Sequence, residues 1–117
     1  MQNSGQYHID KEILERLIKL GGVELLNQMI DLFSETVPEL LEKAKEAFEA
    51  DDLKTVERSM HSLKSTAANL GAMQLHSISE EMEYLAVDQG KEKISTLLPM
   101  AFEKYNIANT ILKTQRM

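Results

Sequence analysis

The sequence has 117 residues, a formal net charge of −6 at pH 7 and no cysteine. This length is enough for one domain with its own hydrophobic core, and the lack of cysteine excludes disulfides and thiolate metal sites, which favours a cytoplasmic setting. The acidic balance argues against nucleic-acid binding, which needs lysine and arginine to neutralise phosphates, and no apolar run is long enough to cross a membrane.

The chain begins with residues 1–8, which show no hydrophobic periodicity and are predicted to form a flexible leader to a single domain over residues 9–117. Asp10 is a typical N-cap, and we expect it to start a short helix that ends at Gly21 and Gly22. The apolar face of this helix is formed by Ile13, Leu14, Leu17 and Ile18.

A longer helical pattern runs from Val23 to Phe48, with apolar residues three or four positions apart. Pro38 interrupts it, because proline lacks the backbone donor and its ring clashes with the preceding turn. A kink and a break into two helices are both open, and we favour the kink.

The next helix is predicted to start after the acidic turn Asp51-Asp52 and to end at Gly71, a position that favours a left-handed residue. His61 does not lie on its apolar face but about 130° from the centre of that face, on a flank that leads to solvent. The same flank carries a small basic patch and two small residues: Lys54, Arg58, Lys64, Ser65 and Ala68.

Two further helices complete the pattern. One contains Leu75 and Met82 and is closed by residues 88–90, and the last starts near Lys91, with Pro99 as an expected bend. No segment alternates with the period of a strand, so the sequence predicts an all-α fold. Because short turns connect the helices, consecutive helices are expected to run antiparallel. The sequence therefore predicts an up-down-up-down four-helix bundle with a short additional N-terminal helix.

His61 is the candidate reactive group, because an exposed imidazole beside positive charge can accept a phosphoryl group. Lys64 lies one turn further on, where its ammonium can reach oxygens attached to the ring. Counting outwards from the turn at Gly71 places His61 level with Glu83, and Lys64 level with Glu80. Glu83 either orients the imidazole or simply solvates its helix, and the sequence leaves both possibilities open.

The other histidines, His8 and His76, have no partners at a chemically meaningful spacing, and we expect them to be ordinary solvated residues. A carboxylate-bridged metal enzyme would need Glu-x-x-His pairs, and none occurs in the sequence. No metal site is therefore expected. A sensor-kinase phosphoacceptor region would need a nucleotide-binding domain downstream, for which the chain is too short. A bundle that acts only as an adaptor, with an unphosphorylated His61, remains the main alternative.

The stretch from His61 to Ala72, with Leu63, Lys64 and Gly71 at fixed places, resembles the signature of the histidine-containing phosphotransfer (HPt) family. The likeness extends to the Gly-Gly break and to the acidic turn before the histidine helix. It implies a helical bundle that accepts a phosphoryl group on His61, with Lys64 beside the phosphate. Ser65 stands where the family often has glycine, which bears on how tightly a partner docks.

The resemblance also implies the partners. They are receiver domains of response regulators, one in a hybrid sensor kinase and one in a downstream regulator, and their aspartates exchange the phosphoryl group with His61. The chain itself would be a phosphocarrier without stand-alone catalysis or a cofactor, because magnesium is expected in the receiver.

A receiver pocket is acidic, so an acidic protein needs a contact face that differs from its average charge. Lys54, Arg58 and Lys64 would supply that charge, while Ser65 and Ala68 keep the surface low. For the apolar part of the interface the candidates are two residues near the chain start, Ile9 and Ile13.

Overall fold

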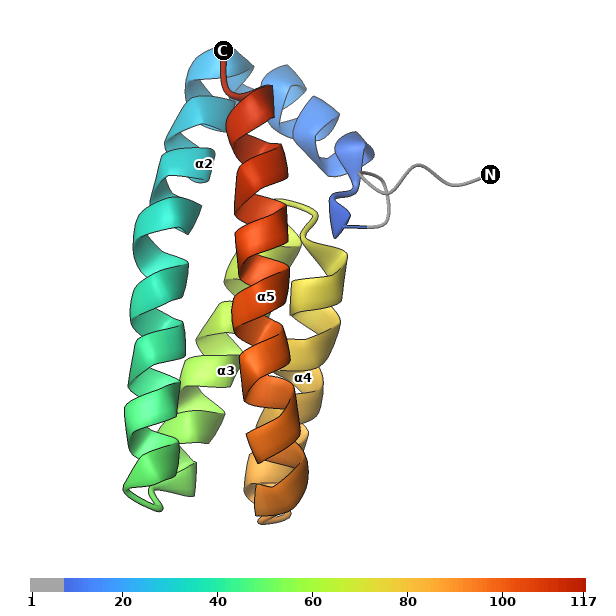
Figure 1. Cartoon of the computed structure of the whole chain (residues 1–117). Coiled ribbons are helices and arrows are strands. Elements are labelled where there is room, and N and C mark those ends of the chain that lie inside the picture. Colours follow the sequence, from blue (N-terminus) through green and yellow to red (C-terminus); the bar gives the residue numbers. More distant parts are fainter. Residues whose placement is uncertain (1–7) are drawn as a thin grey trace.

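The computed structural model describes residues 8–117, and all regular secondary structure in this range is helical. The helices are α2 (Lys11–Glu49), α3 (Leu53–Asn69), α4 (Met73–Val87) and α5 (Lys91–Gln115). They run alternately down and up the bundle, and α5 returns beside α2 (Figure 1). The predicted all-α, up-down-up-down bundle is confirmed. The predicted leader, apart from His8, lies outside the described residues.

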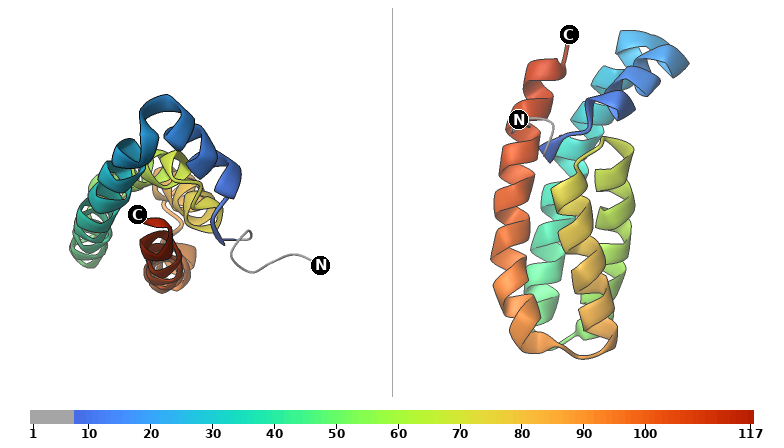
Figure 2. Two further views of the ribbon diagram at one scale, coloured as in Figure 1. Left: turned by 90° about the horizontal axis from the view of Figure 1, so that it is seen from above. Right: turned by 90° about the vertical axis from the view of Figure 1, so that its right-hand side faces the viewer.

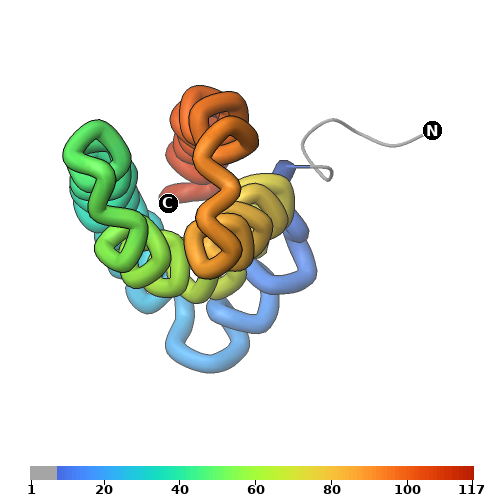
Figure 3. Tube along the Cα trace, turned by 90° about the horizontal axis from the view of Figure 1, so that it is seen from below, coloured from blue at the N-terminus to red at the C-terminus, as the bar shows by residue number. Residues whose placement is uncertain are grey.

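The helices form a bundle because each has apolar residues three or four positions apart, which places them along one side. In α3, for example, Val56, Met60, Leu63 and Ala67 are completely buried, and in α5 Ile94, Ala101 and Leu112 are. Seen along the bundle in Figure 3, the helices are arranged around one interior. In the core, Phe33 packs against Tyr105, with ring centroids 5.5 Å apart. Each large buried side chain contributes about 1.5–3 kcal/mol through the hydrophobic effect.

The helix ends follow local signals in the sequence. The side chain of Asp10 accepts a hydrogen bond from the Glu12 amide at 3.1 Å, and Asp52 accepts one from the Thr55 amide at 3.1 Å. These carboxylates cap α2 and α3, as predicted, because the first amides of a helix have no partner within it. At the other end of α3, Gly71 adopts a φ of 71°.

The expected boundary at the two glycines is a kink inside α2. The expected helix stop at Gly21 and Gly22 appears as a sharp kink within Lys11–Glu49, because the backbone of both glycines is not helical, and residues 11–20 form a helical segment on the N-terminal side of this kink. Gly22 has φ 74° and ψ −172°, a region essentially restricted to glycine. Residues 11–20, here called the first arm, slant away from the rest of α2 at the upper end of the bundle (Figure 2). At Pro38 the helix continues with helical backbone angles, so no break occurs there.

The first arm is tied to the turn between α3 and α4. The Asp10 amide donates to the Gly71 carbonyl at 2.8 Å, and Ile9 beside it is completely buried. The prediction that Ile9 is an exposed docking residue is therefore wrong, because this tie draws its side chain into the core. Ile13 is half-buried.

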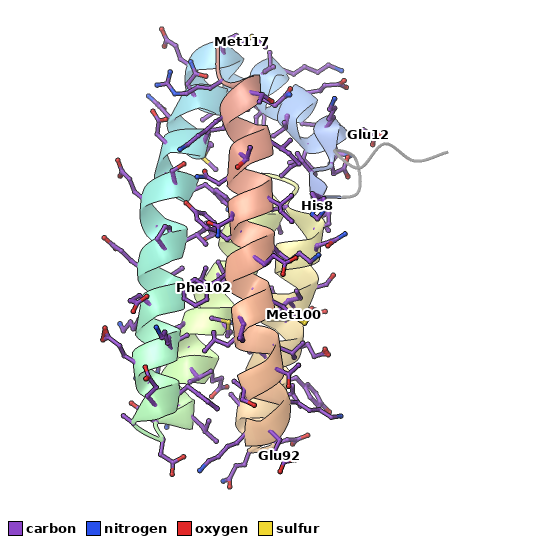
Figure 4. All side chains as sticks on the ribbon, in the orientation of Figure 1. His8, Glu12, Glu92, Met100, Phe102 and Met117 are labelled. Atoms are coloured by element: carbon purple, nitrogen blue, oxygen red, sulfur yellow. The ribbon has the colours of Figure 1, made fainter. Side chains whose placement is uncertain are left out.

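An ion pair joins neighbouring segments at each end of the bundle. Near the C-terminus, Arg116 forms two hydrogen bonds of 2.9 Å with Asp31 of α2, and at the opposite end Lys91 pairs with Asp51. Figure 4 labels Met117 and Glu92 at these two ends. Among the helices of residues 8–117, none has the length and apolarity needed to span a membrane.

Candidate functional site

The imidazole of His61 projects from the middle of α3, on the side away from the core. Its neighbours Met60 and Leu63 are fully buried and fix the orientation of the helix, while 66% of the His61 side chain is exposed. This exposure is what the helical period of the sequence predicts. The ring is accessible to a macromolecular partner without any movement of the bundle.

Glu83 of α4 contacts this ring. Its Oε2 lies 2.8 Å from Nδ1 of His61. A carboxylate oxygen accepts, so Nδ1 carries the hydrogen and donates it. In the neutral ring the lone pair is then on Nε2, for which no partner is recorded within residues 8–117. The prediction that Glu83 lies level with His61, made by counting residues outwards from the turn at Gly71, is therefore confirmed.

The same carboxylate holds Lys64. Nζ of Lys64 lies 2.7 Å from Oε1 of Glu83, so the two oxygens of one carboxylate contact the imidazole and the ammonium. The side chains of Lys64 and Glu83 are only 25% and 20% exposed. The sequence placed Lys64 level with Glu80, but the ion pair is formed with Glu83.

These contacts determine the protonation of the pair. Burial raises the pKa of Glu83, but the hydrogen bonds from Lys64 and His61, with their charges, outweigh burial and hold that pKa below its ordinary value. The hydrogen bond to Glu83 raises the pKa of Lys64. At neutral pH the pair therefore consists of a carboxylate and an ammonium.

The structure gives His76 a contact that the sequence did not predict. Its Nδ1 lies 3.0 Å from the backbone carbonyl of Lys64, and the ring is half-buried between α3 and α4. The expectation of a solvated His76 is wrong. A carbonyl can only accept, so Nδ1 of His76 donates. His8 is also half-buried, and burial, together with the charge of Lys104, lowers its pKa.

A shallow hollow of about 580 Å³ adjoins His61. Besides His61 and Glu83, its lining consists of Lys54, Glu57, Arg58 and Ser62. Lys54 and Arg58 are thus beside His61, as predicted, whereas Glu57 and Ser62 were not singled out in the sequence. At about 100° per residue, the helical period that identified Lys54 and Arg58 places Glu57 within the same flank and Ser62 just beyond Arg58.

The other predicted residues lie further along α3. Ser65 is exposed and Ala68 is half-buried, on the turns that follow His61. Gly71 ends the helix in a buried position where only glycine fits, because a Cβ there would lie 2.7 Å from the Asp10 carbonyl oxygen. Its role is to bring the start of α2 against the hairpin that carries the site.

No group of three metal-binding side chains occurs in the part of the chain that the structure describes. The arrangement of His61, Glu83 and Lys64, here called the histidine cluster, is instead suited to nucleophilic chemistry. It combines an exposed imidazole with one defined donor nitrogen, a carboxylate that can balance positive charge on the ring, and an adjacent ammonium.

Comparisons with known proteins agree with this geometry. The family model of the Hpt domain matches residues 28–105. Among solved structures, the chain is similar to histidine-containing phosphotransfer protein B (HptB) from Pseudomonas aeruginosa PAO1, with a TM-score of 0.88 and 24% sequence identity. The match covers 93% of this chain and 94% of that one. No curated protein matches the sequence.

Proposed function

Because the chain belongs to the Hpt domain family, and is therefore a histidine phosphotransfer protein of a phosphorelay, we propose that His61 is its phosphoacceptor. His61 takes the phosphoryl group from an aspartyl phosphate in one receiver domain and passes it to an aspartate in another. The observation that carries this proposal is the contact between Nδ1 of His61 and Glu83, which leaves the lone pair of an exposed ring on Nε2.

The forward step is a displacement at phosphorus. The Nε2 lone pair forms the N–P bond, the bond between phosphorus and the aspartyl oxygen breaks, and its electron pair leaves with the receiver carboxylate. The ring becomes a cation that still carries hydrogen on Nδ1. Glu83 accepts the hydrogen bond from this nitrogen and balances the new charge.

The reverse step uses the same groups. When a second receiver aspartate attacks phosphorus, the N–P bond breaks and its electrons return to Nε2. Since Nδ1 keeps its hydrogen, the ring leaves as neutral imidazole, which is a better leaving group than an anion. A single orientation of the ring therefore serves transfer in both directions.

Lys64 contributes positive charge next to the phosphoryl group. Its ammonium is held at Oε1 of Glu83, on the carboxylate that contacts the imidazole. From this position it can contact phosphoryl oxygens on His61 by a small rotation of its flexible side chain. Because the negative charge in the transition state lies on those oxygens, this contact accelerates transfer.

The receiver supplies magnesium and the aspartate, and this chain supplies the nucleophile and a contact face. The cations Lys54 and Arg58 lie beside His61 and attract an acidic partner. Ser65 and Ala68 are small and permit close approach, and the half-buried Ile13 adds apolar contact. The source of the phosphoryl group is a hybrid sensor kinase, and its destination is a downstream response regulator.

The test is phosphotransfer from a receiver charged with a small phosphodonor, followed by intact-mass measurement. The wild-type chain should gain one phosphoryl group, and His61→Gln should gain none while keeping its helical circular dichroism. His76→Gln is the matched control, and it should label like the wild type. Labelling of His61→Gln would refute His61 as the phosphoacceptor. A wild-type chain that binds receivers but never becomes phosphorylated would instead favour a bundle that acts only as an adaptor.

A further inference from the structure

A narrow groove runs between α2 and α3, on the side of His61 opposite to α4. Its lining is formed by Leu40 and Lys43 from α2 and by Thr55, Arg58, Ser59 and Ser62 from α3. The α3 residues are spaced by three, one and three positions, so they form one stripe of the helix that faces α2. The volume of the groove is about 160 Å³.

The groove is positively charged. Lys43 and Arg58 are exposed, and within residues 8–117 neither takes part in an ion pair. None of the described residues that line the groove is acidic. Asp52 at the start of α3 accepts hydrogen bonds from the amide and the hydroxyl of Thr55, and these bonds, followed by the charge of Arg58, lower its pKa. Two cations that form no ion pair with the described residues, in a protein of net charge −6, mark a site for an anion.

The groove is continuous with the site. Arg58 and Ser62 line both this groove and the hollow that contains His61. On the other side of His61, α4 presents the carboxylates of Glu80 and Glu81, and both line the surface beyond Lys64. The surroundings of His61 are therefore basic towards α2 and acidic towards α4.

We propose that this groove receives a carboxylate side chain of the receiver domain, so that the receiver sits over α2 and α3 rather than over α4. The inference rests on the proposed function and adds the direction of approach. Small-molecule sites usually have volumes of about 300–1,000 Å³, so a groove of about 160 Å³ fits one acidic side chain better than a nucleotide. Lys43 is the residue that distinguishes this docking from contact with α3 alone.

The experiment compares two charge reversals on α2. Lys43→Glu places a negative charge in the groove, while Lys45→Glu makes the same change on a different side of the same helix, outside the groove. Transfer from a charged receiver that labels the wild type is timed for each variant. Each rate is divided by the rate of direct labelling with phosphoramidate, so that only docking is compared.

Lys43→Glu should lower kcat/KM by about tenfold, because a reversed charge replaces attraction by repulsion at a partly exposed contact. Lys45→Glu should stay within twofold of the wild type, and Glu81→Lys on α4 should cause no loss. Added salt should narrow the gap for Lys43→Glu.

Equal transfer rates for Lys43→Glu and Lys45→Glu would show that the groove does not bind the receiver. A loss of rate in Glu81→Lys as large as in Lys43→Glu would show that the receiver does not approach over α2 and α3. Failure of the wild type to label with either donor would instead refute the proposed function. If inorganic phosphate inhibits the wild type more than chloride at equal ionic strength, and does so equally in Lys43→Glu, the anion site lies elsewhere and the proposal is wrong.

Discussion

The substitution Glu83→Gln tests the histidine cluster most directly, because it keeps the size of the side chain and removes its charge. The charge acts on a ring that becomes cationic during transfer, across a contact of 2.8 Å between Nδ1 and Oε2. Charges about 4 Å apart interact by about 1 kcal/mol in water and about 4 kcal/mol near a protein surface. Since 66% of the His61 side chain is exposed, we take the lower part of that range.

A loss of about 2 kcal/mol in transition-state stabilisation corresponds to a rate lowered about thirtyfold. A second effect acts in the same direction. The glutamine amide can donate to Nδ1 as well as accept from it, so part of the population adopts the tautomer with hydrogen on Nε2. That tautomer has no lone pair at the attacking nitrogen.

Rapid-quench measurement of transfer from a charged receiver gives the rate, and ¹⁵N chemical shifts of the ring give the tautomer. Glu81→Gln is the matched control, since Glu81 is an exposed carboxylate on the same helix without a recorded contact to His61. It should transfer at the wild-type rate. If Glu83→Gln transfers within twofold of the wild type and keeps its tautomer, Glu83 does not support the reaction.

Three further outcomes are expected. Lys64→Ala should slow transfer several-fold in both directions without loss of helical circular dichroism, because a cation beside the phosphoryl oxygens is lost; wild-type rates in both directions would leave Lys64 without a role in transfer. Gly71→Ala should lower the free energy of unfolding by about 2–4 kcal/mol in urea titrations, since a left-handed alanine alone costs about 1–2 kcal/mol and its Cβ would lie 2.7 Å from the Asp10 carbonyl oxygen; a cost below about 1 kcal/mol would contradict this packing. The lowered pKa of Glu83 means that its carboxylate stabilises the fold above its unfolded pKa of about 4.3, and that this contribution disappears as the pH falls through the folded pKa. The difference in melting temperature between wild type and Glu83→Gln should therefore narrow from about pH 5 to about pH 3, and a widening difference would show that the sign is wrong.

Much of the bundle could be predicted because its helices are amphipathic and its turns carry strong local signals. The tight turn after Gly71 also fixed the register of α3 against α4, and this register correctly placed Glu83 beside His61. Counting residues from a turn works here because two antiparallel helices of regular rise leave little freedom in height.

The partner of Lys64 could not be predicted in the same way. A count along the hairpin gives the height of the backbone, whereas a lysine ammonium lies at the end of a long, flexible side chain. It binds Glu83, where the imidazole is also held, rather than Glu80 at its own height. His76 was missed for a related reason, since its partner is a backbone carbonyl, and every residue has one.

The burial of Ile9 was missed because it depends on a contact between distant parts of the chain. The hydrogen bond between Asp10 and Gly71 brings the start of α2 onto the hairpin. Periodicity within a short segment cannot show which distant element covers it. The break at Gly21 and Gly22 could be predicted, because the conformational freedom of glycine is a local signal, whereas the direction in which residues 11–20 slant depends on distant contacts.

The position of the histidine cluster within one hairpin has a consequence for how the molecule is built. The contact of His61 with Glu83 spans 22 residues, whereas the contact that fastens Arg116 to Asp31 spans 85. The entropic cost of closing a loop grows with the logarithm of its length, so the shorter closure is the easier one. The chemical centre thus depends on local chain topology, and the distant closures serve to hold that hairpin within the domain.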